Sequence, residues 1–473
     1  MKQWQSFGWL LFFWALAAVA TWLVHDHVFF WDTVQLGSKH AHWYYQTHFA
    51  DWLLPQEIDS GHPPTFGAYL AIAWYLFGKS LTISHLSMIP FLWLLLFYLW
   101  QLGRHLSKEH YTVWLCVLTT ADPVLAAQSI LISPDIPLSA FFLMAVYSIL
   151  KNNTILKSLT FIALSAISLR GMMLVCALFI WEIVLLQPTW RALPRAIWSK
   201  IGPYLPAGGF ALAFLTAHYA RTGWIGYHPA SPWAPSFERV DALGFFKNMA
   251  VLSWRLLDFG RVFVWIALII ALWGNKMRRI LQKHHNFQQI FWLFIIILLV
   301  LSPSCLLYKG LSGHRYLLPA MLVLTMLTFT TFVDNRYKKL IFSVLTIGLL
   351  SGNTWIYPDK ISQGWDATLA HLPYYRLRAD MIDFIEQQGI EPSAVGTAFP
   401  DIGPFYFRDL SNDSTGFSAK NLYNQSFILY SNIMNDFSDA EIDELRRRWT
   451  PLHSLQRRGV KFILYERNYL TER

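Results

Sequence analysis

The chain has 473 residues, of which 55% are hydrophobic, 17% aromatic and only 14% charged. Soluble domains carry about 25% charged residues, so this composition excludes a soluble globular protein, and likewise a disordered or disulfide-stapled chain. The net charge of +9 does not by itself indicate nucleic-acid binding, because Lys and Arg also accumulate in the cytoplasmic loops of membrane proteins. We therefore expect a polytopic membrane protein.

Apolar runs recur from the N-terminus to about residue 355. A helix that spans a membrane needs about 20 consecutive, mainly apolar residues. We expect roughly eleven spans, some of them short, at about 7–24, 84–102, 112–130, 136–150, 158–169, 172–187, 201–219, 261–274, 290–307, 317–333 and 340–355. The first is interpreted as a retained span, because no small-residue cleavage site follows it.

Clusters of Lys and Arg in alternate loops predict the orientation. They comprise Arg104 and Lys108; Lys151 and Lys157; Arg191, Arg195 and Lys200; Lys276, Arg278, Arg279 and Lys283; and Arg336, Lys338 and Lys339. By the positive-inside rule these clusters mark the cytoplasmic side. An odd number of spans then places the C-terminal region outside the cytoplasm, on the far side of the plasma (inner) membrane. Because the positive charge is concentrated in these loops, we expect no nucleic-acid partner.

Residues 64–78 (PTFGAYLAIAWYLFG) form an apolar run that is not counted as a span. Counting it would place Arg104 and the later basic loops on the wrong face, so we expect an interfacial helix on the non-cytoplasmic surface. The first external loop then covers about 25–84 and gathers acidic residues and histidines. A second external loop, 220–260, is rich in Pro and aromatic residues, which is typical of a substrate-contacting loop.

After residue 355 the composition becomes polar. Amphipathic patterns at about 376–388 and 438–448 predict helices, the second with a capping box from Ser438 to Glu441. Short runs, AVGTAF and VKFILYE, predict strands. We thus expect an all-α polytopic domain at 1–355 followed by a small α/β extracytoplasmic domain at 356–473.

Asp32 and Asp135 are the first catalytic candidates, because ionisable groups near membrane depth are costly and mark functional sites. Asp32 follows Phe29-Phe30-Trp31 just past the first span, where a partly desolvated carboxylate can act as a base. The alternative is a simple cap or loop carboxylate. Asp135 lies in the SPDIP turn. The alternative there is a structural carboxylate that interacts favourably with the dipole at a helix N-terminus. Asp122, deeper in its run, could cap a broken helix before Pro123.

Arg170, His314 and Arg315 lie at the external ends of spans, where a cation either binds a lipid phosphate or simply extends to the headgroups. Arginine is favoured, since its fork matches phosphate geometry. Lys39 is a weaker candidate. The loop histidines lack zinc-site spacing, so we assign no metal ligand, although a divalent cation stays open as a cofactor.

Four motifs occur along the chain in an order that is informative about function. They are Asp32 after the first span, His62-Pro63-Pro64 opening an apolar helix that ends in FGKS, the SPDIP turn, and RYLLP beginning at Arg315. Over residues 1 to about 335 this set resembles the family-39 branch of the GT-C glycosyltransferases. The resemblance implies a GT-C-like fold and an extracytoplasmic active site. There a sugar would leave a polyprenyl-phosphate carrier with inversion of its anomeric centre.

The resemblance also implies that Asp32 is the base. That family often has Asp-Glu where this chain has Asp32-Thr33, which leaves the role of the Glu unfilled or passes it to Glu57 or Asp59. Direct inversion needs a base for the acceptor proton and cations for the leaving phosphate. The expected catalytic residues are Asp32 and Asp135, and the expected substrate or phosphate contacts are His62, Arg170, Arg315, His314, Lys39, Glu57 and Asp59.

A polytopic transporter or flippase is the alternative from another class, because Asp122-Pro123 fits the broken helix of a transporter. The absence of an internal repeat in the sequence and the one-sided acidic residues favour the transferase. The expected partners are a polyprenyl-phosphate sugar, an acceptor glycan, lipid or protein, and membrane lipids. The sequence leaves the sugar and the acceptor open.

Overall fold

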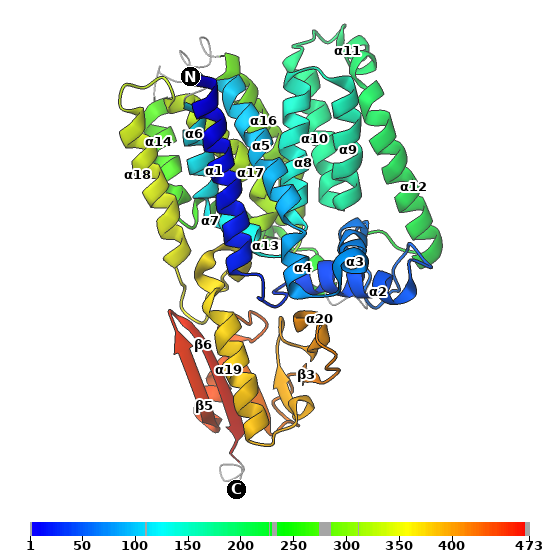
Figure 1. The fold of residues 1–473 in the computed structure, drawn as a ribbon, viewed down its shortest axis with the longest axis vertical. Coiled ribbons are helices and arrows are strands. Elements are labelled where there is room, and N and C mark those ends of the chain that lie inside the picture. Colours follow the sequence, from blue (N-terminus) through cyan, green and yellow to red (C-terminus); the bar gives the residue numbers. More distant parts are fainter. Residues whose placement is uncertain are drawn as a thin grey trace.

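In this computed structural model, residues 2–108, 111–226, 228, 234–273, 285–310 and 312–468 are described. A helical part is followed by a smaller C-terminal part built around a sheet (Figure 1). The N-terminus lies at the end of the helical part that faces away from the C-terminal part (Figure 1). The basic cluster of Lys276, Arg278, Arg279 and Lys283 lies outside the described residues.

Every apolar run that we expected to span the membrane is helical where it is described. The helices are α1 (Lys2–Leu23), α4 (Leu81–Leu86), α5 (Ile89–Leu106), α6 (Thr112–Thr120), α7 (Pro123–Ile130), α8 (Asp135–Leu150), α9 (Thr154–Ile167), α10 (Leu169–Leu185), α12 (Leu205–Thr222), α14 (Arg261–Leu272), α16 (His285–Leu307), α17 (Leu318–Phe332) and α18 (Lys338–Ser351).

Fewer helices than expected meet the length and hydropathy of a membrane span. Within the described residues, three segments are long and apolar enough to cross a membrane: Leu81–Leu106, His285–Leu307 and His314–Phe332. The bent pair of α6 and α7 adds a fourth if it counts as one span. Eleven spans are therefore not confirmed, because most of the other helices are shorter than a bilayer requires.

The run at 112–130 is broken as its Asp-Pro pair predicted. Helices α6 and α7 meet at 72°. The Asp122 carboxylate accepts hydrogen bonds from Val124 N (2.9 Å) and Leu125 N (3.4 Å), and Pro123 occupies the first turn, where its missing N–H costs nothing. Arg261 of α14 donates to both oxygens of Asp122, at 2.8 and 3.2 Å. The expectation that Asp122 caps a broken helix is confirmed.

Short elements gather at the end of the helical part that faces the C-terminal part. They include the π-helical turn η1 (Val34–Lys39), α2 (His40–Thr47) and α3 (Thr65–Phe77), which is the apolar run at 64–78 (Figure 1). Gly67 allows α3 to approach α2 closely, since a Cβ there would lie 2.3 Å from His40 Cβ. The surface loop at 220–260 contains a further helix, α13 (Ala242–Leu257).

The opposite end holds α11 (Leu193–Lys200), on the same side as the N-terminus (Figure 1). There Glu182 is buried and accepts from Lys157 Nζ (2.6 Å) and Tyr204 Oη (2.8 Å), with Lys200 Nζ at 3.3 Å. This cluster joins α9, α10 and α11. Two of the expected basic loops thus lie at the end remote from the C-terminal part.

Within its described residues, the C-terminal part has six strands in the order β2-β3-β1-β4-β6-β5. They are β1 (Val395–Thr397), β2 (Gly403–Pro404), β3 (Gly416–Ala419), β4 (Phe427–Ser431), β5 (Trp449–Arg457) and β6 (Val460–Arg467). β1 is parallel to β3 and β4, whereas β2–β3, β4–β6 and β5–β6 are antiparallel. The helices are α19 (Pro373–Gln387), α20 (Tyr406–Asp409) and α21 (Asp439–Arg448), and the capping box of Ser438 and Glu441 is present.

The two parts share a core at their junction. Phe30, from the loop after α1, is buried in the core of the C-terminal part and stacks on His371 with ring centroids 4.9 Å apart. The backbone N–H of Phe29 also donates to Arg408 O at 2.9 Å. The aromatic run of the first loop therefore fastens the C-terminal part to the segment that carries Asp32.

Candidate active site

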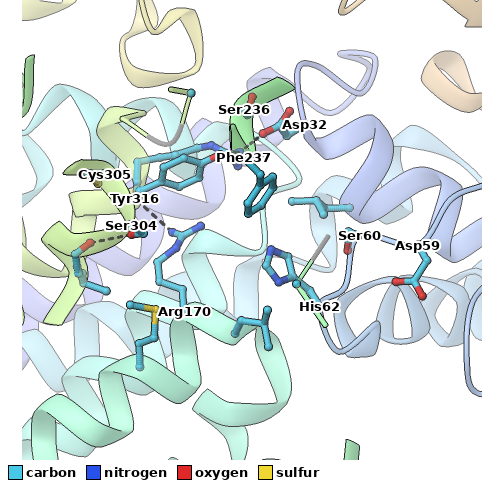
Figure 2. Close-up of a pocket in the computed structure, with 17 residues that line it drawn as sticks. Asp32, Asp59, Ser60, His62, Arg170, Ser236, Phe237, Ser304, Cys305 and Tyr316 are labelled. Atoms are coloured by element: carbon cyan, nitrogen blue, oxygen red, sulfur yellow. Dashed lines mark hydrogen bonds and ion pairs between the residues drawn. The ribbon is translucent and has the colours of Figure 1, made fainter. Parts of the chain in front are cut away.

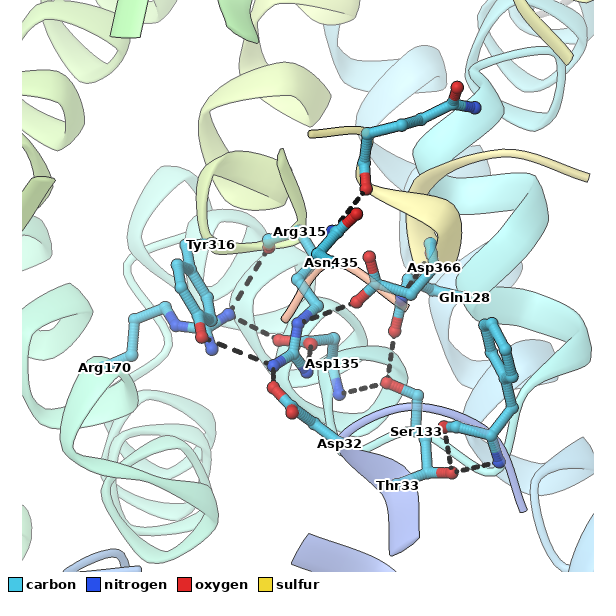
Figure 3. A network of polar contacts seen from close by, with 12 residues as sticks. Asp32, Thr33, Gln128, Ser133, Asp135, Arg170, Arg315, Tyr316, Asp366 and Asn435 are labelled. Carbon is cyan, nitrogen blue, oxygen red and sulfur yellow. Dashed lines mark hydrogen bonds and ion pairs between the residues drawn. The ribbon is translucent and has the colours of Figure 1, made fainter. Parts of the chain in front are cut away.

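Arg315 lies at the centre of an ion-pair network between the helical part and the C-terminal part. It stands in the short 3₁₀ turn η5 (His314–Leu317), directly before α17. Its Nη2 pairs with Asp32, its Nη1 lies 3.3 Å from Asp135 Oδ2, and its Nε lies 3.0 Å from Asp366 Oδ2. Figure 3 shows the three carboxylates around this one guanidinium group. Each of the three guanidinium nitrogens thus lies next to a different carboxylate.

A tight turn presents Asp32. Trp31 adopts a positive φ of 57°, and the Thr33 hydroxyl closes the turn by donating to Phe30 O (2.6 Å) and accepting from Phe30 N (3.0 Å). The carbonyl of Asp32 then accepts from the first residues of η1. Thr33, which stands where the family that this sequence resembles often has Glu, thus has a local structural role.

Asp135 and Arg170 come from two helix N-termini. Asp135 is buried in the first turn of α8, and its Oδ1 pairs with Arg170 Nη1. Ser168 caps α10 by accepting from Gly171 N at 3.2 Å, which places Arg170 in the first turn. The Arg170 guanidinium lies 4.7 Å from the centre of the Tyr316 ring, and Arg315 lies 5.0 Å from it. Both arginines are held by carboxylates and do not extend to the surface.

Asp366 is the third carboxylate, supplied by the turn η7 (Trp365–Ala367) after α18. Burial raises the pKa of the Asp366 carboxyl to about 6; Arg315 opposes this shift, and the nearby charges of Asp32 and Asp135 add to it. The network holds one carboxylate more than guanidinium groups. The carboxyl group of Asp366 therefore binds a proton at mildly acidic pH.

A small cavity of about 230 Å³ lies on one side of this network. Its charged and polar wall includes Asp32, His62, Arg170, Arg315 and Tyr316, and its apolar wall comes from α10 and α16, with Leu169, Met173 and Leu301. Figure 2 shows Arg170, Tyr316 and His62 around the same space, with Phe237 between them. Cationic groups and an apolar wall thus meet in one enclosure.

His62 lines the small cavity as a neutral imidazole. Burial lowers its pKa to about 4, and the positive charge of Arg170 adds to the shift. Its Nδ1 is buried and has no hydrogen-bond partner among the described residues. His62 can therefore donate or accept one hydrogen bond, but it does not supply the positive charge that the sequence suggested for a phosphate contact.

A larger cavity of about 600 Å³ lies on the other side of the network, between the helical and C-terminal parts. Its walls include Trp31, Gln35 and Lys39 from the first loop and Asp366, Asn435 and Asp436 from the C-terminal part. Asp32, Arg315 and Tyr316 line both cavities. The ion-pair network therefore separates two enclosures of different size and polarity.

A solved structure of ArnT from Cupriavidus metallidurans, bound to undecaprenyl phosphate, is similar to the chain almost end to end. The TM-score is 0.54 at 12% sequence identity, over 97% of this chain and 98% of that chain. The chain has the fold of a GT-C glycosyltransferase. No protein-family model and no curated protein sequence matches it significantly. At 12% identity the similarity concerns the fold alone. The roles of the site residues are therefore argued from their contacts in this chain.

Of the remaining expected site residues, three line one of the two cavities and one does not. His314 and Lys39 line the large cavity, and Asp59 lines the small one. His314 Nε2 is bonded to Asp258 Oδ2 at 2.8 Å, and Asp59 Oδ2 is bonded to His218 Nε2 at 2.9 Å, so both are held by neighbours. Glu57 is exposed and lines neither of the two cavities, and the structure does not bring it to the site.

The site also contains residues that sequence reasoning missed. Asp366 lies beyond the last span in a segment expected to belong to the separate soluble domain, and Tyr316 was noted only as part of RYLLP. Gln128 holds Asp366 in place by donating to its backbone carbonyl at 2.7 Å. The available signal was the acidic residue in GWDATLA, which stands between apolar neighbours soon after the last helix.

The loop expected at 220–260 contributes Ser236 and Phe237 to the small cavity, although residues 227 and 229–233 lie outside the described residues. Across the described part of the chain, no group of three or more His, Cys, Asp or Glu side chains is placed to hold a metal ion.

Proposed function

We propose that the protein is an inverting glycosyltransferase of the inner membrane that moves a sugar from a polyprenyl phosphate to an acceptor hydroxyl on the extracytoplasmic face. One observation carries the proposal. The two cavities meet at Asp32 and Arg315, so that a carboxylate and a cation stand between them. The GT-C fold and the undecaprenyl phosphate bound by the similar ArnT structure support a lipid-linked donor.

The donor is proposed to bind in the small cavity. Its phosphate would lie near Arg170 and Arg315, and the first isoprene units would lie against Leu169, Met173 and Leu301. As the bond between the anomeric carbon and the phosphate oxygen breaks, negative charge grows on the leaving phosphate. Fixed guanidinium groups in a buried site stabilise that charge more than water does.

The acceptor is proposed to enter through the large cavity and to meet the anomeric carbon opposite the phosphate. Asp32 would take the proton of its hydroxyl as the new carbon–oxygen bond forms, and polyprenyl phosphate would leave as an anion. Direct displacement inverts the anomeric centre. Asp135, which contacts Arg170 and Arg315, is a positioning residue that fixes both cations.

The test uses membrane vesicles that carry the wild type or Asp32→Asn and receive a polyprenyl-phosphate donor with a labelled sugar. We expect transfer by the wild type and a loss of at least about 100-fold in the variant, since general-base catalysis contributes 10²–10⁴-fold. Asp380→Asn, at an exposed position of α19, is the matched control and should transfer normally.

Equal transfer by the wild type and Asp32→Asn would remove Asp32 as the base. Movement of the labelled lipid across the vesicle membrane, with no glycoside formed by the wild type, would instead support the transporter or flippase alternative.

A further inference from the structure

The large cavity has a distinct chemistry that identifies a class of acceptor. We propose that it binds a neutral saccharide, with a sugar ring against Trp31 and its hydroxyls bonded to Gln35 and Lys39. This inference rests on the proposed transferase function and names the acceptor that this function leaves open.

The π-helical turn η1 forms the wall between the two cavities. Leu36 lines the small cavity, Gln35 and Lys39 line the large one, and Asp32, two residues before the turn, lines both. Gln35 and Lys39 are four residues apart, which in a π turn of slightly more than four residues places them on one side. Single π turns occur frequently at functional sites. The turn that carries the groups proposed to bind the acceptor thus begins two residues after the proposed base.

Several polar atoms on the walls of the large cavity lack partners. Gln35 Oε1, Arg255 Nε and His314 Nδ1 are buried without a hydrogen bond to any described residue. The ammonium group of Lys39 lies over the Phe407 ring, 5.4 Å from its centre. A buried polar atom that stays unsatisfied destabilises the fold. Hydroxyl groups both donate and accept, so a saccharide can bond to polar side chains of either kind on these walls.

Trp31 provides the apolar surface that a sugar ring needs beside these polar groups. It lines the large cavity and contacts Phe399 edge to face, with ring centroids 5.2 Å apart. Its φ of 57° is uncommon for a bulky residue, and such strained conformations cluster at functional sites. An aromatic face surrounded by a few placed donors and acceptors is the usual composition of a small-molecule site.

The charges of the cavity favour a neutral ligand over a phosphorylated one. Arg315 is bonded to three carboxylates, and Arg408 donates to the carbonyl oxygens of Pro400, Ile402, Gly403 and Pro404. Arg315 is already assigned to the donor phosphate, Arg408 has no free fork for a second phosphate, and Arg255 lies 3.8 Å from the carboxylate of Asp258. Burial, with the positive charge of Arg408, lowers the pKa of Lys39 to about 8, so its ammonium group loses its charge as the pH rises through 8.

A peptide acceptor fits less well. Peptides commonly bind by adding a strand to a sheet edge. Ile402, directly before the edge strand β2 (Gly403–Pro404), lines the large cavity, and the carbonyl oxygens of β2 are already bonded to Arg408. The walls of the large cavity therefore offer side chains, with their mixed donors and acceptors, more than a free backbone edge.

Binding to the full-length protein in lipid nanodiscs, without donor, tests this inference by saturation-transfer NMR. The probes are a panel of neutral trisaccharides built from N-acetylglucosamine, glucose, galactose or mannose, a 1-phosphorylated glucosamine disaccharide, and a Ser/Thr-rich peptide. We expect at least one neutral trisaccharide to bind more tightly than the other two kinds of probe. Trp31→Ala and Gln35→Ala should each weaken it roughly tenfold, the loss of one contact.

Trp31→Phe should retain most of the binding, and Trp190→Ala, which alters an 89% exposed tryptophan remote from the cavity, should retain all of it. Thermal unfolding of each variant checks that it folds, and Gln35→Glu serves if Gln35→Ala does not. No binding by any neutral trisaccharide, tighter binding of the phosphorylated sugar or the peptide, or unchanged binding by Trp31→Ala would overturn the inference. Saccharide binding with no turnover of any donor would overturn the transferase function instead.

Discussion

Arg315 contacts a different carboxylate through each of its nitrogens, which the single ammonium of a lysine cannot reproduce. We expect Arg315→Lys to fold but to lower transfer by about 10²–10³-fold, the usual effect of losing an oriented charge beside a leaving group. The assay is initial-rate transfer from a labelled donor. Arg376→Lys, at an exposed position of α19, is the matched control. Transfer within threefold of the wild type would show that the fork geometry of Arg315 is dispensable.

Asp366 gives the site a predicted dependence on pH. Its pKa in the folded protein is raised from 3.8 to about 6, so the folded state binds this proton more tightly than the unfolded state. The corresponding stability is present below about pH 4 and is lost as the pH rises through 6, by roughly 2–3 kcal/mol. The unfolding temperature of the wild type, relative to Asp366→Asn, should therefore fall between pH 4 and 6.5 and stay level above. A difference that does not vary with pH would contradict this assignment.

The sequence identified the charged centre of the site except for Asp366. Asp32, Asp135, Arg170 and Arg315 could be found because each is an ionisable residue at the end of an apolar helix. Asp366 could not, because its place depends on how the segment after α18 folds back against η5. Glu57 was expected at the site because it is close to His62 in the sequence, but it lines neither cavity.

At the scale of single elements, the contact of α9 with α10 depends on one glycine. A Cβ at Gly171 would lie 1.8 Å from Leu164 O, so the helices must separate to accept it. Because Arg170 precedes this glycine, we expect Gly171→Ala to lower both the unfolding temperature and the transfer rate. Gly208→Ala in α12 meets nothing within 4 Å and should be neutral or stabilising by about 0.5–1 kcal/mol. Equal effects of the two substitutions would refute the close-approach argument.

Elements with a local signal were predicted better than those without one. The break at Asp122-Pro123 and the capping box at Ser438 follow from chemistry within a few residues, and both are present. Strand β5 (Trp449–Arg457) was not foreseen, because it is an edge strand with a proline and largely exposed side chains. Its place comes from pairing with β6 through the turn at Arg458-Gly459, where both φ angles are positive.

For the whole molecule, the two ends of the helical part should face opposite sides of the membrane. In a background without Cys116, Cys176 and Cys305, we expect Tyr423→Cys in the C-terminal part to react with an impermeant maleimide on intact cells. Trp190→Cys, beside α11, should react only after the membrane is opened. Both positions are highly exposed, at 80% and 89%. Labelling of Trp190→Cys on intact cells would reverse the predicted orientation.

The arrangement of the molecule explains why the C-terminal part matters to the site. It supplies one wall of the large cavity, and Phe30 anchors it next to the turn that carries Asp32. Sequence patterns predicted that this part exists and how some of its elements fold. They could not predict its docking, which depends on contacts between residues hundreds of positions apart.

The most direct test of the central claim uses the purified protein, a defined polyprenyl-phosphate sugar and an acceptor saccharide that binds in the large cavity. Free polyprenyl phosphate and glycoside are quantified together, and NMR gives the configuration of the new bond. We predict one polyprenyl phosphate released per glycoside formed, with an inverted anomeric carbon. Retention of configuration, or glycoside formed without release of polyprenyl phosphate, would contradict direct displacement at Asp32.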